Sequence, residues 1–297
     1  MGAKISVHVG AHKTASTHFQ KMLRRNEDRL RASGTTVLLP RELRKGAIPM
    51  QKIAAGALKS DPVAIDAGSA AFWDAIAGAS NVLLSDENML GSAHNMSMRK
   101  IGKFYPDGHV RLHRLLSGLG ISEATVFLAI RDPAHFFVSA YSQRVTSRGY
   151  VRFDSFLGEL DVCTIYWSEF VERMKTCPGV GRLVVWRYED YPNIAPVVLR
   201  EMLPEEVAET IDLKGRVTHS GLSAAAHLKI ELAERSGTSL SSADIRVIRA
   251  ALPKGDAGPG YMPFDVNLLH DSARYYEEDL ADIARLPGVT LLGYQGS

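Results

Sequence analysis

The chain has 297 residues, which corresponds to one large domain or two small ones. Its 35 Lys and Arg residues and 33 Asp and Glu residues leave a net charge of +2, which excludes a basic nucleic-acid tail, and we expect no nucleic-acid partner. The two cysteines, Cys163 and Cys177, exclude a disulfide-stapled scaffold. No apolar stretch approaches the roughly 20 residues that span a bilayer, so we expect a cytoplasmic protein without stable membrane insertion.

Short apolar runs typical of strands alternate with helical patterns along the first 200 residues or so. The predicted strands are 4–9, 35–39, 81–85, 125–130 and 182–187. The predicted helices between them are 17–31, 67–77, 110–119, 134–148, 162–176 and 194–202. Continuous apolar strands are typical of a parallel sheet covered on both faces, so the pattern predicts a three-layer α/β fold with a central parallel sheet.

Beyond residue 205 we predict no further strands. The patterns there indicate additional C-terminal helices at 223–234, 241–251 and 268–286. We expect a single domain over 1–297, with a core of about 4–204 and a helical C-terminal extension of about 205–297. The Gly/Pro-rich stretch 253–263 is interpreted as a connecting loop, with a lid over the site as the alternative.

The most informative segment joins the first predicted strand to the first helix, with the sequence Gly-Ala-His-Lys-Thr-Ala-Ser-Thr at 10–17. A glycine turn at such a junction directs backbone N–H groups into one concavity, and the helix N-terminus adds positive potential. Lys13 adds a full charge, and Thr14, Ser16 and Thr17 add hydroxyl donors. We therefore expect a site for a phosphate-like anion; the alternative is an ordinary capped helix with an incidental lysine.

This turn departs from a standard Walker A loop, because Lys13 follows Gly10 by three residues and Ala15 stands where a second glycine might be. Gly-x-x-Lys-Thr-Ala-Ser-Thr after an apolar strand, with Gln20 behind it, resembles the 5′-phosphosulfate loop of bacterial sulfotransferases. These enzymes use 3′-phosphoadenosine 5′-phosphosulfate (PAPS), leave adenosine 3′,5′-bisphosphate (PAP), and have a fold similar to P-loop kinases. The resemblance implies a P-loop-like fold and cofactor contacts from Gly10, Lys13, Thr14, Ala15, Ser16 and Thr17.

A second motif follows the predicted strand 125–130, where Arg131-Asp132-Pro133 precedes Ser139 by about two helical turns. Asp132 suits an N-cap and Pro133 a first helical residue, which places Arg131 at the edge of the sheet where ligands bind. The motif is similar to the 3′-phosphate motif of the same family, which implies that Arg131 and Ser139 hold the 3′-phosphate. An ion pair between Arg131 and a neighbouring carboxylate is the alternative. The resemblance covers roughly residues 4–200.

Sulfuryl transfer to a hydroxyl needs a base near the acceptor oxygen and positive charge on the leaving phosphate. Lys13 fits the second role. For the first, Ser85-x-Glu87 after the third strand resembles the motif whose glutamate is the proposed base in many bacterial and polysaccharide sulfotransferases. An ordinary cap on the next turn is the alternative for Glu87. His12 is an alternative base, and a packed or solvated histidine is the simpler interpretation of it.

Two other functions stay open. Val-Leu-Leu-Ser-Asp-Glu at 82–87 also fits a Walker B strand, which would indicate a magnesium-dependent kinase or ATPase. The missing Gly-Lys-Ser/Thr argues against this, and so does the Arg131–Ser139 pair, because ATP has no 3′-phosphate. A non-catalytic nucleotide-binding protein is the third hypothesis. The histidines of the turn lack metal-ligand spacing, so we expect no metal cofactor.

Three further segments carry weaker signals. Lys214-Gly215-Arg216 resembles a cofactor-side loop of polysaccharide sulfotransferases, which implies a contact from Arg216, although the following residues depart from that pattern. The segment 186–190 looks like a strand end of the same family, and we interpret it as structural. The basic residues between 144 and 152 are typical of a solvated face, with recruitment of an anionic acceptor as the alternative. The acceptor (small molecule, carbohydrate or lipid) and the oligomeric state stay undetermined.

Overall fold

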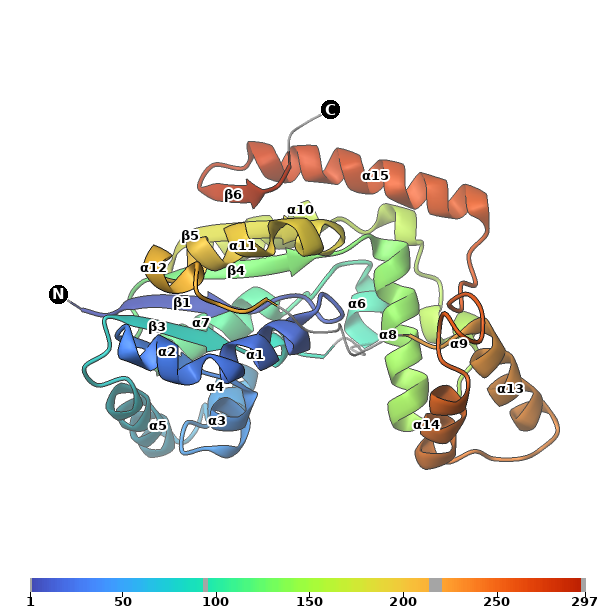
Figure 1. Ribbon diagram of the computed structural model, residues 1–297, viewed down its shortest axis with the longest axis horizontal. Helices are drawn as coiled ribbons and strands as arrows, with labels where there is room; N and C mark the ends of the chain where they lie inside the picture. The colour runs from blue at the N-terminus through green and yellow to red at the C-terminus, as the bar shows by residue number, and fades with distance from the viewer. Residues whose placement is uncertain (1, 93–95, 214–220, 295–297) are drawn as a thin grey trace.

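A six-stranded parallel sheet forms the centre of the molecule (Figure 1). The computed structural model describes residues 2–92, 96–213 and 221–294. The strand order is β2-β3-β1-β4-β5-β6, and all neighbouring strands are parallel. The strands are β1 (Lys4–His8), β2 (Thr35–Leu38), β3 (Asn81–Ser85), β4 (Ala124–Ile130), β5 (Val180–Arg187) and β6 (Val289–Leu292). The predicted α/β class with a central parallel sheet is confirmed, as are the five predicted strands.

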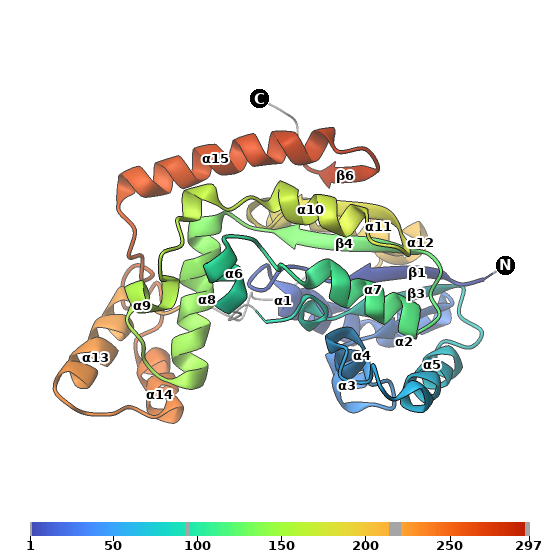
Figure 2. The ribbon, with the colours of Figure 1, turned by 180° about the vertical axis from the view of Figure 1, so that it is seen from behind.

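Alternate residues of the central strands point to opposite faces of the sheet, as the pleat requires. Leu83 and Phe127 belong to one hydrophobic cluster, whereas their neighbours Leu84 and Leu128 belong to the other. Three helices that cover the first cluster lie in front in Figure 1: α1 (Ser16–Arg25), α2 (Glu27–Ala32) and α11 (Tyr191–Met202). Three that cover the second lie in front in Figure 2: α4 (Met50–Ala55), α7 (Gly108–Gly118) and α10 (Trp167–Lys175). Burial on both faces explains why the strands are continuously apolar.

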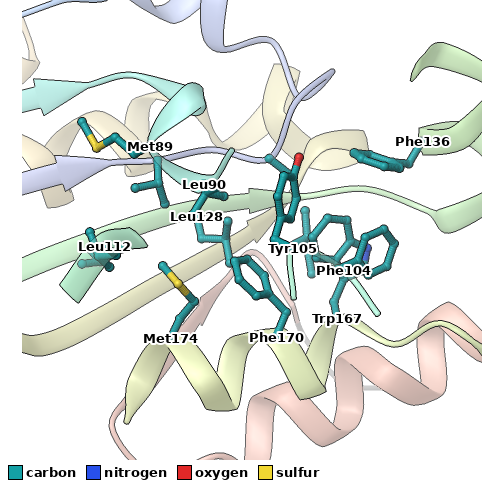
Figure 3. Packing of buried hydrophobic residues seen from close by; sticks show 14 of the residues in the cluster. Met89, Leu90, Phe104, Tyr105, Leu112, Leu128, Phe136, Trp167, Phe170 and Met174 are labelled. Atoms are coloured by element: carbon teal, nitrogen blue, oxygen red, sulfur yellow. The ribbon is translucent and has the colours of Figure 1, made fainter. Parts of the chain in front are cut away.

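An aromatic cluster lies between the end of β4 and α10 (Figure 3). The rings of Phe104 and Trp167 stack with centroids 3.6 Å apart, and Trp167 Nε1 donates a hydrogen bond to the carbonyl oxygen of Arg131 (2.7 Å). Tyr105 is also buried, with its ring centroid 5.4 Å from that of Phe170. Figure 3 shows its hydroxyl directed away from Phe170 and Trp167. The cluster therefore fixes a polar group at the carboxyl edge of the sheet.

Helix α8 (Pro133–Arg148) runs across the carboxyl ends of the strands (Figures 1 and 2). The Asp132 side chain accepts a hydrogen bond from the His135 N–H (2.9 Å) and Pro133 is the first helical residue, which confirms the predicted N-cap. Helix α14 (Ser242–Ala251) packs along α8. The other helices are α3 (Pro40–Lys45), α5 (Pro62–Ala75), α6 (Met96–Ile101), α9 (Phe153–Leu157), α12 (Glu205–Ala208), α13 (Ala224–Arg235) and α15 (Val266–Arg285). Short 3-10 turns are η1 (Glu87–Leu90), η2 (Val162–Thr164) and η3 (Tyr188–Asp190).

The C-terminal helices pack on the same core as the sheet. Leu222 and Leu280 belong to the hydrophobic cluster that contains Leu128. Asp279 of α15 accepts a hydrogen bond from the backbone N–H of Trp167 (2.6 Å), which satisfies an N-terminal donor of α10. No helix within the described ranges is long and apolar enough to cross a membrane.

Three predictions about elements were wrong. The helix predicted over 162–176 is a 3-10 turn, η2, followed by α10, which begins at Trp167. The strands do not stop at residue 205, because β6 follows α15 and pairs with β5, with Val289 opposite Leu183. Its four residues are too few to stand out beside a long helix, and only the pairing identifies them as a strand. The helix predicted over 17–31 is two helices, because the Asn26 side chain donates to the Met22 carbonyl (2.9 Å) where α1 ends.

The Gly/Pro-rich loop 253–263 contains no helix or long strand, as predicted. Its backbone is hydrogen-bonded to the segment before α13, where Tyr261 N–H donates to the Leu222 carbonyl (2.9 Å). The Tyr261 ring stacks on His227 with centroids 3.7 Å apart. These contacts fix the loop against α13.

Candidate anion-binding site

The segment between β1 and α1 is held against β4 before it turns. The Val9 N–H donates to the Phe127 carbonyl (3.0 Å), and the Ala11 N–H donates to the Ala129 carbonyl (2.9 Å). Gly10 lies between them with φ +28°, and a Cβ there would lie 2.8 Å from both His8 Nε2 and Ser16 Oγ. Only glycine allows this close approach without displacement of its neighbours.

Two non-glycine residues of the turn have left-handed backbone conformations. Lys13 has φ +69° and Ala15 has φ +65°. Such conformations cost about 1–3 kcal/mol each and are concentrated at functional sites. The first bonds of α1 are donated by His18 and Phe19 to the Ala15 carbonyl, so the earlier N–H groups have no partner within the helix. The strained turn thus presents unpaired donors at the start of α1.

The turn opens into a cavity of about 350 Å³ at the carboxyl edge of the sheet. Its described lining comes from the turn, the start of α1, η1, the residue after β4, α8, η3, the segment before α13, and α14: His12, Lys13, Ala15, Ser16, Thr17, His18, Glu87, Arg131, Ser139, Ser142, Gln143, Thr146, Ser147, Tyr188, Gly221, Leu222, Arg246 and Arg249. These described residues include four Lys and Arg side chains and one carboxylate. The excess of positive charge favours an anionic ligand.

Lys13 and Arg131 lie together in this lining. An Nη1 N–H of Arg131 donates to the Lys13 carbonyl oxygen (3.0 Å), and the guanidinium carbon is 4.6 Å from the centroid of the Tyr188 ring. Burial, together with the charges of Arg131 and Arg249, lowers the pKa of Lys13 to about 8. A lysine is thus held among like charges, and an anion bound between them would relieve the repulsion.

Two buried polar atoms in the lining have no hydrogen-bond partner among the described residues: Arg131 Nε and Ser16 Oγ. No carboxylate of the described residues lies within ion-pair distance of Arg131, although burial raises the pKa of Glu189 and the charge of Arg131 opposes that rise. Buried donors without partners are costly in the absence of a ligand. Phosphate or sulfate oxygens accept from such donors and would satisfy them.

One face of α8 forms a polar wall of the cavity. Its members recur every three or four residues: Ser139, Ser142, Gln143, Thr146 and Ser147. They carry hydroxyl and amide groups and no charge, so they suit a polar ligand. The Ser142 hydroxyl donates to the Val138 carbonyl (3.1 Å), whereas no partner for the Ser139 hydroxyl is recorded within the described chain.

Glu87, the predicted base, borders the cavity from the first residue of η1. Its carboxylate accepts hydrogen bonds from Gln20 Nε2 and from Arg44 Nη2, both at 3.0 Å. Burial raises the pKa of Glu87, but the neighbouring His12, a backbone hydrogen bond, Arg44 and Gln20 outweigh it, so the pKa lies below its ordinary value. Glu87 is therefore an ionised acceptor at neutral pH.

His12 has polar contacts at both ring nitrogens. Nδ1 is 2.8 Å from the Tyr105 hydroxyl, and Nε2 is 3.0 Å from the Asn88 side-chain amide. The Tyr105 hydroxyl also accepts from the His12 backbone N–H (3.0 Å). Burial lowers the pKa of His12, so the ring is neutral near pH 7. The aromatic cluster thereby orients a histidine that contacts the cavity.

Asp86, the residue that a Walker B interpretation would use for magnesium, is completely buried and bound by Arg44. Arg44 donates from Nε and Nη2 to the two carboxylate oxygens (2.8 and 2.6 Å), and the Asn88 N–H donates to the same carboxylate (2.8 Å). Both of its oxygens are therefore engaged by this chain.

Most of the residues predicted from the sequence motifs line this cavity. Lys13, Ala15, Ser16, Thr17, Arg131, Ser139, Glu87 and His12 all line the cavity. Gly10 shapes the turn from behind, and the Thr14 hydroxyl donates to the Ala11 carbonyl (2.5 Å) within the turn. Arg216 lies outside the described residues. In the described chain neither the loop 253–263 nor the arginines of 144–152 line the cavity.

Several lining residues were missed by the sequence analysis. Tyr188 was interpreted as structural, yet its ring lies under Arg131. The hydroxyl and amide residues of α8 recur every three or four positions, and this spacing is visible in the sequence. Arg246 and Arg249 reach the cavity only because α14 packs on α8, and Arg44 reaches Glu87 from α3, so neither contact has a local sequence signal.

Comparisons with known proteins found no match to a protein-family model, to a curated protein or to a solved structure.

We expect Arg44→Met to lower the free energy of unfolding by about 2–5 kcal/mol, because it leaves the buried Asp86 carboxylate without its guanidinium partner. Urea unfolding measures this loss. The matched control is Arg41→Met on an exposed position of the same helix, for which we expect a change within about 0.5 kcal/mol. Equal stabilities of the two variants would contradict a structural role for the Arg44–Asp86 pair.

Proposed function

We propose that this protein is a PAPS-dependent sulfotransferase of a P-loop-like fold, which transfers a sulfuryl group from PAPS to a hydroxyl or amine acceptor. The observation that carries the proposal is the meeting of two sequence motifs in one cavity. Lys13 of the turn and the Arg131–Ser139 pair are more than a hundred residues apart in the chain, yet all three line the same cavity. PAPS carries anionic groups at two separate positions, and the cavity offers one motif for each.

The position of the cavity in the sheet also supports the proposal. The chain runs from β1 to β2 and β3 on one side and then to β4 on the other, so β1 lies at the point where the strand order reverses. Ligands of open parallel sheets bind outside the carboxyl ends of the strands at such a point. The segments that follow β1, β3 and β4 supply Lys13, Glu87 and Arg131.

The residues of the cavity fit PAPS by the chemistry of their donors. The buried Ser16 hydroxyl and Arg131 Nε have no partner in the described chain, and the first N–H groups of α1 lie beside them. We assign the 5′-phosphosulfate to the turn with Lys13, and the 3′-phosphate to Arg131 and Ser139. PAPS supplies the activated sulfuryl group for the reaction.

Residues of this chain would stabilise the leaving group and accept the proton of the acceptor. Lys13 stabilises the negative charge that grows on the leaving phosphate oxygens. Glu87 accepts the proton of the acceptor hydroxyl, and Gln20 and Arg44 hold its carboxylate in place. His12 lies beside Glu87, and contacts with Tyr105 and Asn88 hold its ring in place.

The binding prediction uses ligands that differ in the 3′-phosphate. We expect PAP to raise the melting temperature of the protein, and Mg-ATP and 5′-AMP to raise it less, because ligand affinity is linked to stability. Arg131→Ala should weaken PAP binding by about 2–5 kcal/mol in calorimetry and weaken 5′-AMP binding less, because 5′-AMP lacks the 3′-phosphate.

The kinase hypothesis predicts the reverse of this pattern. Stabilisation by Mg-ATP without a response to PAP would contradict the sulfotransferase proposal, as would an EDTA-sensitive turnover of ATP. Tight PAP binding with no sulfuryl transfer to any acceptor tested would favour the non-catalytic nucleotide-binding hypothesis.

The second prediction concerns the charge of Lys13. Lys13→Met should lower turnover about 10²–10³-fold with a smaller loss of PAPS affinity, because the charge acts mainly on the leaving group. In the free protein the pKa of Lys13 is about 8, so a phosphate that raises it makes PAP binding take up protons above that pH.

Calorimetry at pH 8.5 in buffers of different ionisation enthalpy measures this uptake. PAP affinity should fall as the pH rises above about 8, and Lys13→Met should abolish both the uptake and this fall. Wild-type binding without proton uptake would place the phosphates away from Lys13.

The third prediction concerns the base. Glu87→Gln should fold and bind PAP normally but lose about 10²–10⁴-fold in turnover. Because the pKa of Glu87 lies below its ordinary value of 4.5, its protonation should reduce wild-type turnover only under about that pH. Near-normal turnover in this variant would move the base elsewhere, and His12 would be tested next.

A further inference from the structure

Two arginines of α14 face the cavity without compensating acids. Arg246 is exposed and Arg249 is half-buried, and both line the cavity from one face of the helix, one turn apart. Neither has a recorded ion pair or hydrogen bond within the described chain, and no acid stands three or four residues from either one. Like charges at this spacing repel each other, which disfavours the helix by a few tenths of a kcal/mol.

Some exposed helical arginines of this chain are paired with an acid of the same helix. Arg235, Arg274 and Arg285 each contact a carboxylate three or four residues away, at 2.7–2.9 Å. Exposed arginines such as Arg114 and Arg148 also have no ion pair within the described chain, but they lie outside the cavity lining, whereas the pair on α14 borders it. Its charge is directed at a cavity rather than at a neighbouring acid.

The described surroundings of the pair do not neutralise it. The facing wall is the uncharged hydroxyl and amide face of α8, and the one carboxylate among the described lining residues, Glu87, is already held by Arg44 and Gln20. The charge of Arg249 reaches Lys13, where it contributes to the lowered pKa of that lysine. Arg249 is therefore close to the place where the sulfuryl group would be transferred.

We propose that Arg246 and Arg249 bind an anionic group of the acceptor, so that the preferred acceptor is a hydroxyl compound that also carries a carboxylate, sulfate or phosphate. This proposal rests on the proposed function, because it assigns the two anionic ends of the nucleotide to the turn and to Arg131 with Ser139. An acceptor with its own negative charge is repelled by PAPS, so it needs cations of its own near Lys13. Arg246, as the exposed member, lies where such an acceptor meets solvent.

The test uses protein saturated with PAP, so that the nucleotide positions are filled before a second anion is added. The probes are inorganic sulfate and glucuronate at millimolar concentration, with chloride and glucose as controls matched in ionic strength and size. We expect sulfate and glucuronate to raise the melting temperature of the PAP-saturated wild type, and the controls to leave it unchanged. The double variant Arg246→Met/Arg249→Met should lose this shift.

The same variant separates the acceptor from the nucleotide. We expect its PAP affinity to fall much less than its affinity for glucuronate, which should fall at least tenfold, as for the loss of a charged hydrogen bond. Arg235→Met on α13, which is outside the cavity lining, is the control and should retain the glucuronate response.

Each other outcome has a distinct meaning. If PAP binds the wild type but neither anion adds to it, the acceptor subsite is refuted and the proposed function stands. If the double variant loses PAP affinity instead, the arginines belong to the nucleotide and the acceptor proposal is equally refuted. If PAP itself does not bind, the proposed function fails before the second anion is added.

Discussion

The candidate site depends on the hydrogen bonds that hold the chain between β1 and α1 against β4. The bonds from Val9 and Ala11 to β4 continue the pairing of the two strands past their ends, and they bring Lys13 beside Arg131, whose guanidinium donates to the Lys13 carbonyl. Without this register, Lys13 and Arg131 would not lie beside each other. A one-residue slip of β1 against β4 would exchange the faces of the strand and turn Lys13 away from the cavity.

Charge is distributed unevenly around this edge of the sheet. On the side of β3, the carboxylates of Asp86 and Glu87 are satisfied internally by Arg44, Gln20 and the Asn88 N–H. On the side of α8 and α14, no carboxylate of the described residues lies within ion-pair distance of the lining cations, although burial raises the pKa of Glu189 and the charge of Arg131 opposes that rise. Positive charge therefore exceeds negative charge in the described lining, which favours an anionic ligand. A folded chain tolerates this arrangement when a ligand supplies the missing anions.

The strands and the two motifs are predictable from sequence because their signals are local. A continuous apolar run such as that of β4 and a glycine turn with Lys13 each occupy fewer than ten residues. Strand β6 was missed because only its tertiary pairing with β5 identifies it. Arg44 was missed because it reaches the site from the helix that follows β2, and Arg249 because it reaches the site from a helix that packs on α8. Local patterns show which residues can bind an anion, whereas packing decides which of the 35 basic side chains surround the cavity.

The strain in the turn and the repulsion among the cations have one physical cause. The left-handed conformations of Lys13 and Ala15 direct both the lysine and the start of α1 to the cavity. As a consequence the amine is buried, and its pKa is about 8. Both costs are incurred when the protein folds, before any ligand arrives. An anion therefore meets donors and charges that need no reorganisation, and preorganised charge of this kind stabilises a transition state more effectively than water does. We therefore expect a ligand to stabilise most the turn and the segment after β4, whose buried donors of Ser16 and Arg131 have no partner within the described residues.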